Sequence, residues 1–99
     1  MNSRHSAVKR FESIRVPDVW EWVSRRWPTA TPLVQVMKVA EEAGEANGAE
    51  IKCREGRKTE QDVRDELADT IIAAMGALQA RGADPGREVA VRWAEVVKR

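Results

Sequence analysis

The stretch that decides the fold is residues 59–81, TEQDVRDELADTIIAAMGALQAR. Thr59 and Asp62 resemble a capping box, with Asp in the position of the usual Glu, and predict the first turn of a helix. Gly82, directly after the stretch, suits the C-terminal cap of that helix. Residues 70–78 are apolar on every side, so we expect this part of the helix to be buried all round. The stretch therefore predicts a long helix inside an all-α domain.

Three further helices are predicted, at about residues 17–27, 32–53 and 85–97. A proline stands at each start, and Thr31 suits the N-cap of the second of these helices. Their apolar faces have helical spacing and comprise Val16, Val19, Trp20, Val23 and Trp27, then Leu33, Met37, Ala40, Gly44 and Ile51, then Val89, Trp93, Val96 and Val97. Strand signals are weak throughout. Four helices with short connections predict a four-helix bundle or a bundle-forming dimer.

Length and composition limit the classes of function. Ninety-nine residues make one domain, which we place at residues 16–99 after a flexible basic leader of residues 1–15. The 17 basic and 16 acidic residues nearly balance, so the basic excess typical of a nucleic-acid partner is missing. No apolar run approaches the roughly 20 residues that span a bilayer. Cys53 is the single cysteine, which excludes an internal disulfide and suits a reducing cytoplasm.

Nucleophilic catalysis by a side chain has little support in the sequence. His5 is the only histidine, and it lies in the polar leader. Any Ser–His or Cys–His scheme would depend on that one residue. Any catalytic chemistry is therefore expected among the carboxylates.

Two groups of acidic residues lie on the second and third predicted helices. They are Glu41, Glu42 and Glu45 on the one, and Asp62, Glu66 and Asp69 on the other. The spacing i, i+3 places Glu42 beside Glu45, and Glu66 beside Asp69, on one face of each helix. On adjacent antiparallel helices the two pairs can converge. Four carboxylates form an all-oxygen ligand set, which suits Mg²⁺ or Mn²⁺ rather than zinc or copper. Di-iron bundles need Glu-x-x-His motifs, and these helices contain no histidine.

A solvated charged face is the plain alternative to a metal site, and composition alone does not separate the two. Asp69 favours the metal, because it directly precedes the apolar stretch of residues 70–78. A carboxylate at the mouth of a buried face needs a partner, and a divalent cation is a good one.

These residues resemble a known family. EEAGE at residues 41–45 followed by ELAD at residues 66–69 resembles the EExxE…ExxD signature of the MazG-like nucleotide pyrophosphohydrolases. Residues 46–65 separate the two halves, and the resemblance covers about residues 32–99. It implies an all-α fold, a homodimer or dimer of dimers, and cleavage of nucleoside triphosphates between the α and β phosphates with Mg²⁺ as cofactor, Mn²⁺ being the alternative.

The resemblance also assigns roles to residues. Glu42, Glu45, Glu66 and Asp69 would be the metal ligands, with Glu42 also part of the catalytic machinery. Glu41 would be a catalytic helper that orients the attacking water. Lys38 would pair with Glu42 or reach a phosphate, with a plain surface ion pair as the alternative.

Substrate-binding residues are less clearly marked. Trp20 is our candidate for stacking on a base, with core packing as its alternative; Trp22, Trp27 and Trp93 offer the same chemistry. Arg57 and Lys58, in a basic loop, would receive phosphates unless the loop is simply solvated. The relatives often carry phosphate-contacting residues on the following helix, and the basic residues there cannot be matched one to one.

The leading hypothesis is thus a cytoplasmic Mg²⁺-dependent nucleoside triphosphate pyrophosphohydrolase with a nucleoside triphosphate as partner. The second is a helical nucleotide- or metal-binding regulatory module with little or no turnover. The third is a dimerisation bundle with a solvated acidic face.

Overall fold

The computed structural model describes residues 15–99, and the regular secondary structure of this part of the chain is all helical. It contains α2 (Val19–Arg26), α3 (Pro32–Arg54), α4 (Glu60–Gln79) and α5 (Pro85–Val96), with no strand among the described residues. The all-α prediction is confirmed. The predicted leader, apart from Arg15, and His5 within it lie outside the described residues. No described helix combines the length and the apolar character that crossing a bilayer requires.

Local hydrogen bonds begin the long helices where the sequence predicts them. The backbone N–H of Asp62 donates to Thr59 Oγ1 at 3.1 Å, and the Thr59 N–H donates to Asp62 Oδ2 at 2.8 Å, so the capping box of α4 is complete. At the start of α3, the Val34 N–H donates to Thr31 Oγ1 at 3.2 Å. Gly82 adopts a φ of 76° just after α4, a conformation that glycine reaches without strain.

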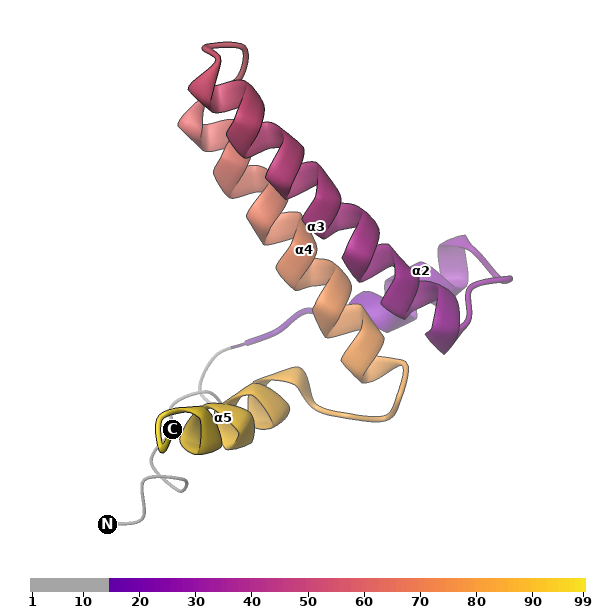
Figure 1. Cartoon of the computed structure of the whole chain (residues 1–99). Helices are drawn as coiled ribbons and strands as arrows, with labels where there is room; N and C mark the ends of the chain where they lie inside the picture. The colour runs from indigo at the N-terminus through magenta and orange to yellow at the C-terminus, as the bar shows by residue number, and fades with distance from the viewer. Residues whose placement is uncertain (1–14) are drawn as a thin grey trace.

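The helices α3 and α4 form a long antiparallel hairpin, and α2 packs against α4 near the base of that hairpin (Figure 1). The helix α5 leaves the end of α4 and has little contact with the other described helices. In the single chain, therefore, α5 does not complete a four-helix bundle with the hairpin and α2.

Small side chains make up most of the buried surface of the hairpin. The buried residues of its two helices are Gln35, Ala46 and Ala49 on α3, and Val63, Ala73, Gly76 and Ala77 on α4. Helices that meet through alanine and glycine approach closely, because no large side chain stands between their backbones. The close approach brings side chains on the flanks of the two helices within reach of each other.

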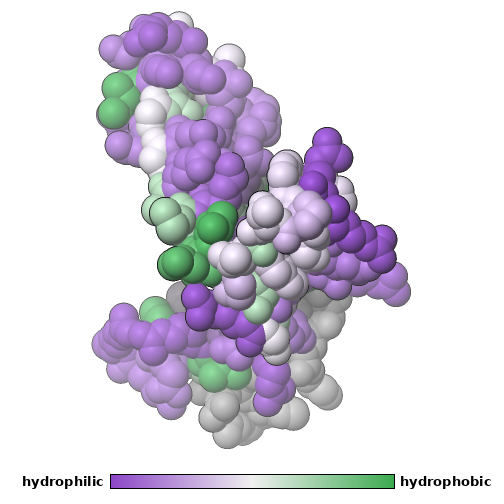
Figure 2. Space-filling model, turned by 90° about the vertical axis from the view of Figure 1, so that its right-hand side faces the viewer, coloured by the Kyte–Doolittle hydropathy of each residue, from purple (hydrophilic) through white to green (hydrophobic). Residues whose placement is uncertain are grey.

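The structure corrects two expectations about burial. Residues 70–78 are not buried all round, since Ile71 is 57% and Ile72 45% exposed. The predicted apolar stripe of α3 is also open, because Leu33, Met37 and Ile51 are all exposed. The physical reason is that α3 and α2 cover only part of the surface of α4, and α3 contacts α4 through its alanine face instead. Figure 2 shows apolar surface between the hydrophilic tip of the hairpin and the lower part of the molecule, which contains α5.

Candidate metal centre

Three carboxylates from the two hairpin helices meet at one point. Glu42 and Glu45 stand one turn apart on α3, and Glu66 faces them from α4. One oxygen of each residue lies within 4.8 Å of the others. The convergence that the i, i+3 spacing predicts is therefore present for these three residues.

The oxygen atoms of this cluster fit a hard divalent cation. Glu66 Oε2 is buried and has no hydrogen-bond partner among the described residues, and a buried polar atom without a partner is costly. Glu42 is also largely withdrawn from solvent, with 14% of its side chain exposed, while Glu45 is exposed. Mg²⁺ is usually bound by one or two protein carboxylates, with water and substrate phosphates as its remaining ligands. The three carboxylates supply more than that number of ligands, and the exposed Glu45 leaves water and phosphate access to the cation.

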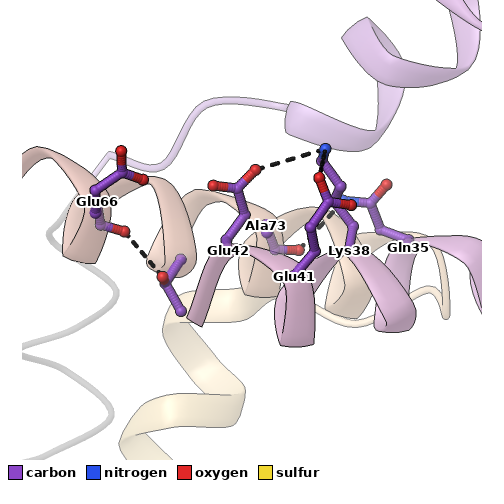
Figure 3. A network of polar contacts seen from close by, with 7 residues as sticks. Gln35, Lys38, Glu41, Glu42, Glu66 and Ala73 are labelled. Carbon is purple, nitrogen blue, oxygen red and sulfur yellow. Dashed lines mark hydrogen bonds and ion pairs between the residues drawn. The ribbon is translucent and has the colours of Figure 1, made fainter. Parts of the chain in front are cut away.

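The surroundings of Glu42 disfavour its charged form. Burial and, second to it, the charge of Glu45 raise the pKa of Glu42 above its ordinary value, and the nearby Lys38 lowers it only in part. Lys38 Nζ lies 3.1 Å from Glu41 Oε1 and 3.5 Å from Glu42 Oε1, so one cation bridges both acids (Figure 3). The hydrogen bond to Glu41 is the main reason that the pKa of Lys38 is raised. The predicted pairing of Lys38 with Glu42 is thus present, and it is shared with Glu41.

Asp69 is not part of the three-carboxylate cluster. It is exposed, whereas the sequence places it at the mouth of a buried face, and the reason is the open surface of α4 around Ile72. Asp69 lies one turn from Glu66 on α4, and it lines a cavity together with Glu42. Its predicted role as a fourth ligand stays a prediction.

Two cavities adjoin the carboxylates. The larger, of about 820 Å³, lies between α2 and the α3–α4 hairpin and is lined by Glu42, Asp69 and Lys38 together with a mainly apolar wall. A second cavity, of about 480 Å³, is polar. Its lining includes Glu41, Glu45, Glu66, Lys52 and Lys58. The acidic residues thus line both a mainly apolar cavity, which contains Lys38, and a polar cavity, which contains Lys52 and Lys58.

Some of the predicted substrate-binding residues line these cavities and others do not. Lys58 lines the polar cavity, but Arg57 is exposed and pairs with Glu55 at 3.2 Å. Trp20 is not among the residues that line the larger cavity, and its backbone N–H donates to Gln79 Oε1 at 3.0 Å. Trp22 lines that cavity in its place, since residues two apart on a helix point in nearly opposite directions.

Two residues at these cavities were not singled out from the sequence. Gln35 lines the larger cavity, and Lys52 lines the polar one. Gln35 lies seven residues before Glu42, and Lys52 seven residues after Glu45, which is two helical turns and hence the same face of α3. That spacing is the signal that could have identified both.

Comparisons of the chain with protein-family models, with curated proteins and with solved structures found no match. The resemblance of residues 32–99 to the MazG-like family therefore remains a prediction, and it depends on the motif residues themselves.

The raised pKa of Glu42 predicts a pH-dependent cost in the metal-free protein. Because the folded protein binds this proton more tightly than the unfolded chain does, the free energy of unfolding falls as the pH rises above the ordinary value of 4.5. We expect the melting temperature of Glu42→Gln, measured by circular dichroism without divalent cations, to rise relative to that of wild type as the pH increases from 4.5 to 7. At pH 7 with Mg²⁺, wild type should have the higher melting temperature of the two. Parallel melting temperatures across this pH range would contradict the assigned environment of Glu42.

Proposed function

We propose that the protein is a Mg²⁺-dependent nucleoside triphosphate pyrophosphohydrolase with a MazG-type fold, which releases a nucleoside monophosphate and pyrophosphate. One observation carries the proposal. Glu42, Glu45 and Glu66 converge within 4.8 Å from two facing helices, and Glu66 contributes a buried oxygen without a partner. The spacing of the motif in the sequence agrees with this geometry.

In this proposal Glu42, Glu45 and Glu66 hold the cation, and Asp69 joins them from the side of the larger cavity. When bound, Mg²⁺ neutralises phosphate charge and increases the acidity of a bound water, and Mn²⁺ supplies the same chemistry. Phosphoryl transfer asks little more of a protein than positioning and charge stabilisation, which explains how an acidic hairpin without histidine suffices.

Glu41 and Lys38 have the proposed task of orienting the reactants. Glu41 is exposed, so water reaches it, and Lys38 holds its carboxylate by the hydrogen bond of 3.1 Å. Glu41 would orient a water molecule toward the α-phosphorus. A new bond forms between the water oxygen and that phosphorus, and the water gives up a proton to solvent. The bond from the phosphorus to the oxygen that bridges the α and β phosphates breaks, and pyrophosphate leaves. Lys52 and Lys58, in the polar cavity beside Glu45 and Glu66, would receive the departing phosphates.

A second function is favoured by a specific observation, namely that the cluster contains three carboxylates and not the four of the motif. A site in which Asp69 stays apart would still bind a cation and a nucleotide but turn over poorly. Such a protein would be a nucleotide- or metal-binding regulatory module, the second hypothesis that the sequence suggests. The two functions differ in turnover and agree in binding.

We further propose that the protein acts as a homo-oligomer, a dimer or a dimer of dimers. Large apolar side chains are exposed on every described helix, among them Leu33 and Met37 on α3, Ile71 on α4, and Val89 and Trp93 on α5. Soluble monomers seldom expose apolar surface of this extent, and association would cover it.

The oligomer is tested by sedimentation at micromolar concentration. A species of at least twice the chain mass of 11.1 kDa is expected, because no element among residues 15–99 covers the exposed apolar side chains of α3 and α4. A single 11 kDa species would overturn the proposal. The double variant Leu33→Glu with Ile71→Glu should shift the protein toward that monomer.

Hydrolysis is tested with a panel of nucleoside triphosphates and Mg²⁺, with products separated by ion-exchange chromatography. We expect nucleoside monophosphate and pyrophosphate as first products. Asp69→Asn, Glu45→Gln and Glu66→Gln should each lose nearly all activity, because each removes a carboxylate from the cation site.

Asp62→Asn is the matched control for these variants. Asp62 is acidic and near the cluster in sequence, but its contacts are with Thr59 in the cap of α4, so activity should survive. Release of orthophosphate and a nucleoside diphosphate, or normal hydrolysis by Asp69→Asn, would count against the proposed reaction. Binding without turnover across the whole panel would favour the module.

A further inference from the structure

The larger cavity has a chemical character that differs from that of the carboxylates at its edge. Glu42, Asp69 and Lys38 belong to its lining, and the lining also includes apolar residues such as Val23 on α2, Val34 on α3 and Ile72 on α4. Its volume of about 820 Å³ lies within the range of cavities that bind small molecules. A ligand that contacts both the charged and the apolar residues of this lining must combine a charged part with a flat or apolar part.

One polar residue of the cavity lining, Gln35, is buried. Gln35 is only 5% exposed and lines the cavity. Its Nε2 donates to the backbone carbonyl of Ala73 at 3.3 Å, across the hairpin. Since a carbonyl oxygen only accepts hydrogen bonds, the amide of Gln35 must present its NH₂ to Ala73. Its Oε1 then faces away from Ala73, on the same side of α3 as the amine of Lys38 (Figure 3).

Gly76 on α4 makes room for this side chain. A Cβ atom at position 76 would lie 2.9 Å from Gln35 Nε2 and 2.9 Å from Val19 Cγ1, closer than real contacts allow. The absence of a side chain at Gly76 therefore lets Gln35 and α2 come together beside the cavity. Gly76 thus leaves the space in which the Gln35 amide donates to Ala73, and this hydrogen bond sets the direction of Gln35 Oε1.

Aromatic rings stand on the α2 side of the same cavity. Trp22 and Trp27 both line it, their ring centroids are 5.5 Å apart, and the rings meet edge to face at 76°. The guanidinium of Arg26 lies 5.3 Å and 5.6 Å from the two centroids and holds the pair together. Both rings remain about half exposed, so ring surface is available to a planar ligand.

We infer that this cavity is the base-binding site of the nucleotide, and that Gln35 Oε1 accepts a hydrogen bond from an N–H group of the base. The inference rests on the proposed function, since it assumes that the carboxylates handle the phosphates. A base offers the planar surface that Trp22 and Trp27 accommodate. Gln35 would distinguish a base that has an N–H donor on the edge facing Gln35 Oε1 from a base that has no donor there. Gln35 is thus a specificity-determining residue.

The test measures binding without turnover. Tryptophan fluorescence is followed while AMP, CMP, GMP or UMP is added in the presence of Mg²⁺. The monophosphate that binds most tightly is then compared with its counterpart in which methyl groups replace the N–H hydrogens of the base. Wild type should bind the parent about tenfold more tightly, the effect of one hydrogen bond and of leaving a buried acceptor unpaired. Gln35→Leu, which cannot accept a hydrogen bond, should bind the two equally.

Two controls separate this inference from the proposed reaction. Gln61→Leu makes the same change on the exposed part of α4, where Gln61 contacts Asp65, and should discriminate like wild type. Tripolyphosphate with Mg²⁺ has no base, so Gln35→Leu should bind it as wild type does. Discrimination that persists in Gln35→Leu, equal binding of both ligands by wild type, or no binding of any monophosphate would overturn the base site. Loss of hydrolysis across the triphosphate panel, with discrimination intact, would overturn the reaction alone.

Discussion

The close contact of α3 with α4 through small side chains is the constraint on which the rest of the structure depends. Ala46 and Ala49 on α3 and Ala73 on α4 are buried, and acidic residues on the flanks of these helices are thereby brought within 4.8 Å. At an effective dielectric constant of about 20, two unit charges at that distance repel by about 3.5 kcal/mol before screening. Lys38 compensates for only part of this. The hairpin therefore holds together charges that a divalent cation would neutralise.

Local signals in the sequence predicted the helices well, because a cap needs only neighbouring residues. Thr59 with Asp62 and Thr31 with Pro32 begin α4 and α3 as expected. Periodicity was less informative about burial. It identified the stripe containing Leu33 as an apolar face, but the partner that covers a face is a tertiary property. In the chain alone, α3 contacts α4 through alanines and leaves that stripe exposed.

The same distinction applies to the site. The spacing i, i+3 was enough to bring Glu42, Glu45 and Glu66 together, since it concerns two helix faces and one hairpin. Asp69 and Trp20 depend on how α2 and neighbouring surfaces cover α4, which no local pattern reports. Gln35 acquires its place from Gly76 on another helix, and only the packed structure connects the two.

Direct measurement of cation binding tests the central claim, that the hairpin carboxylates form a metal site. Mn²⁺ can be titrated into the protein and its free concentration followed by electron paramagnetic resonance, with Mg²⁺ as competitor. Wild type should bind Mn²⁺, and added Mg²⁺ should displace it. Glu66→Gln should bind Mn²⁺ more than about tenfold more weakly, because loss of a residue that only supports a metal ligand already costs about tenfold in affinity. Equal binding by wild type and Glu66→Gln, or none by wild type, would contradict the claim.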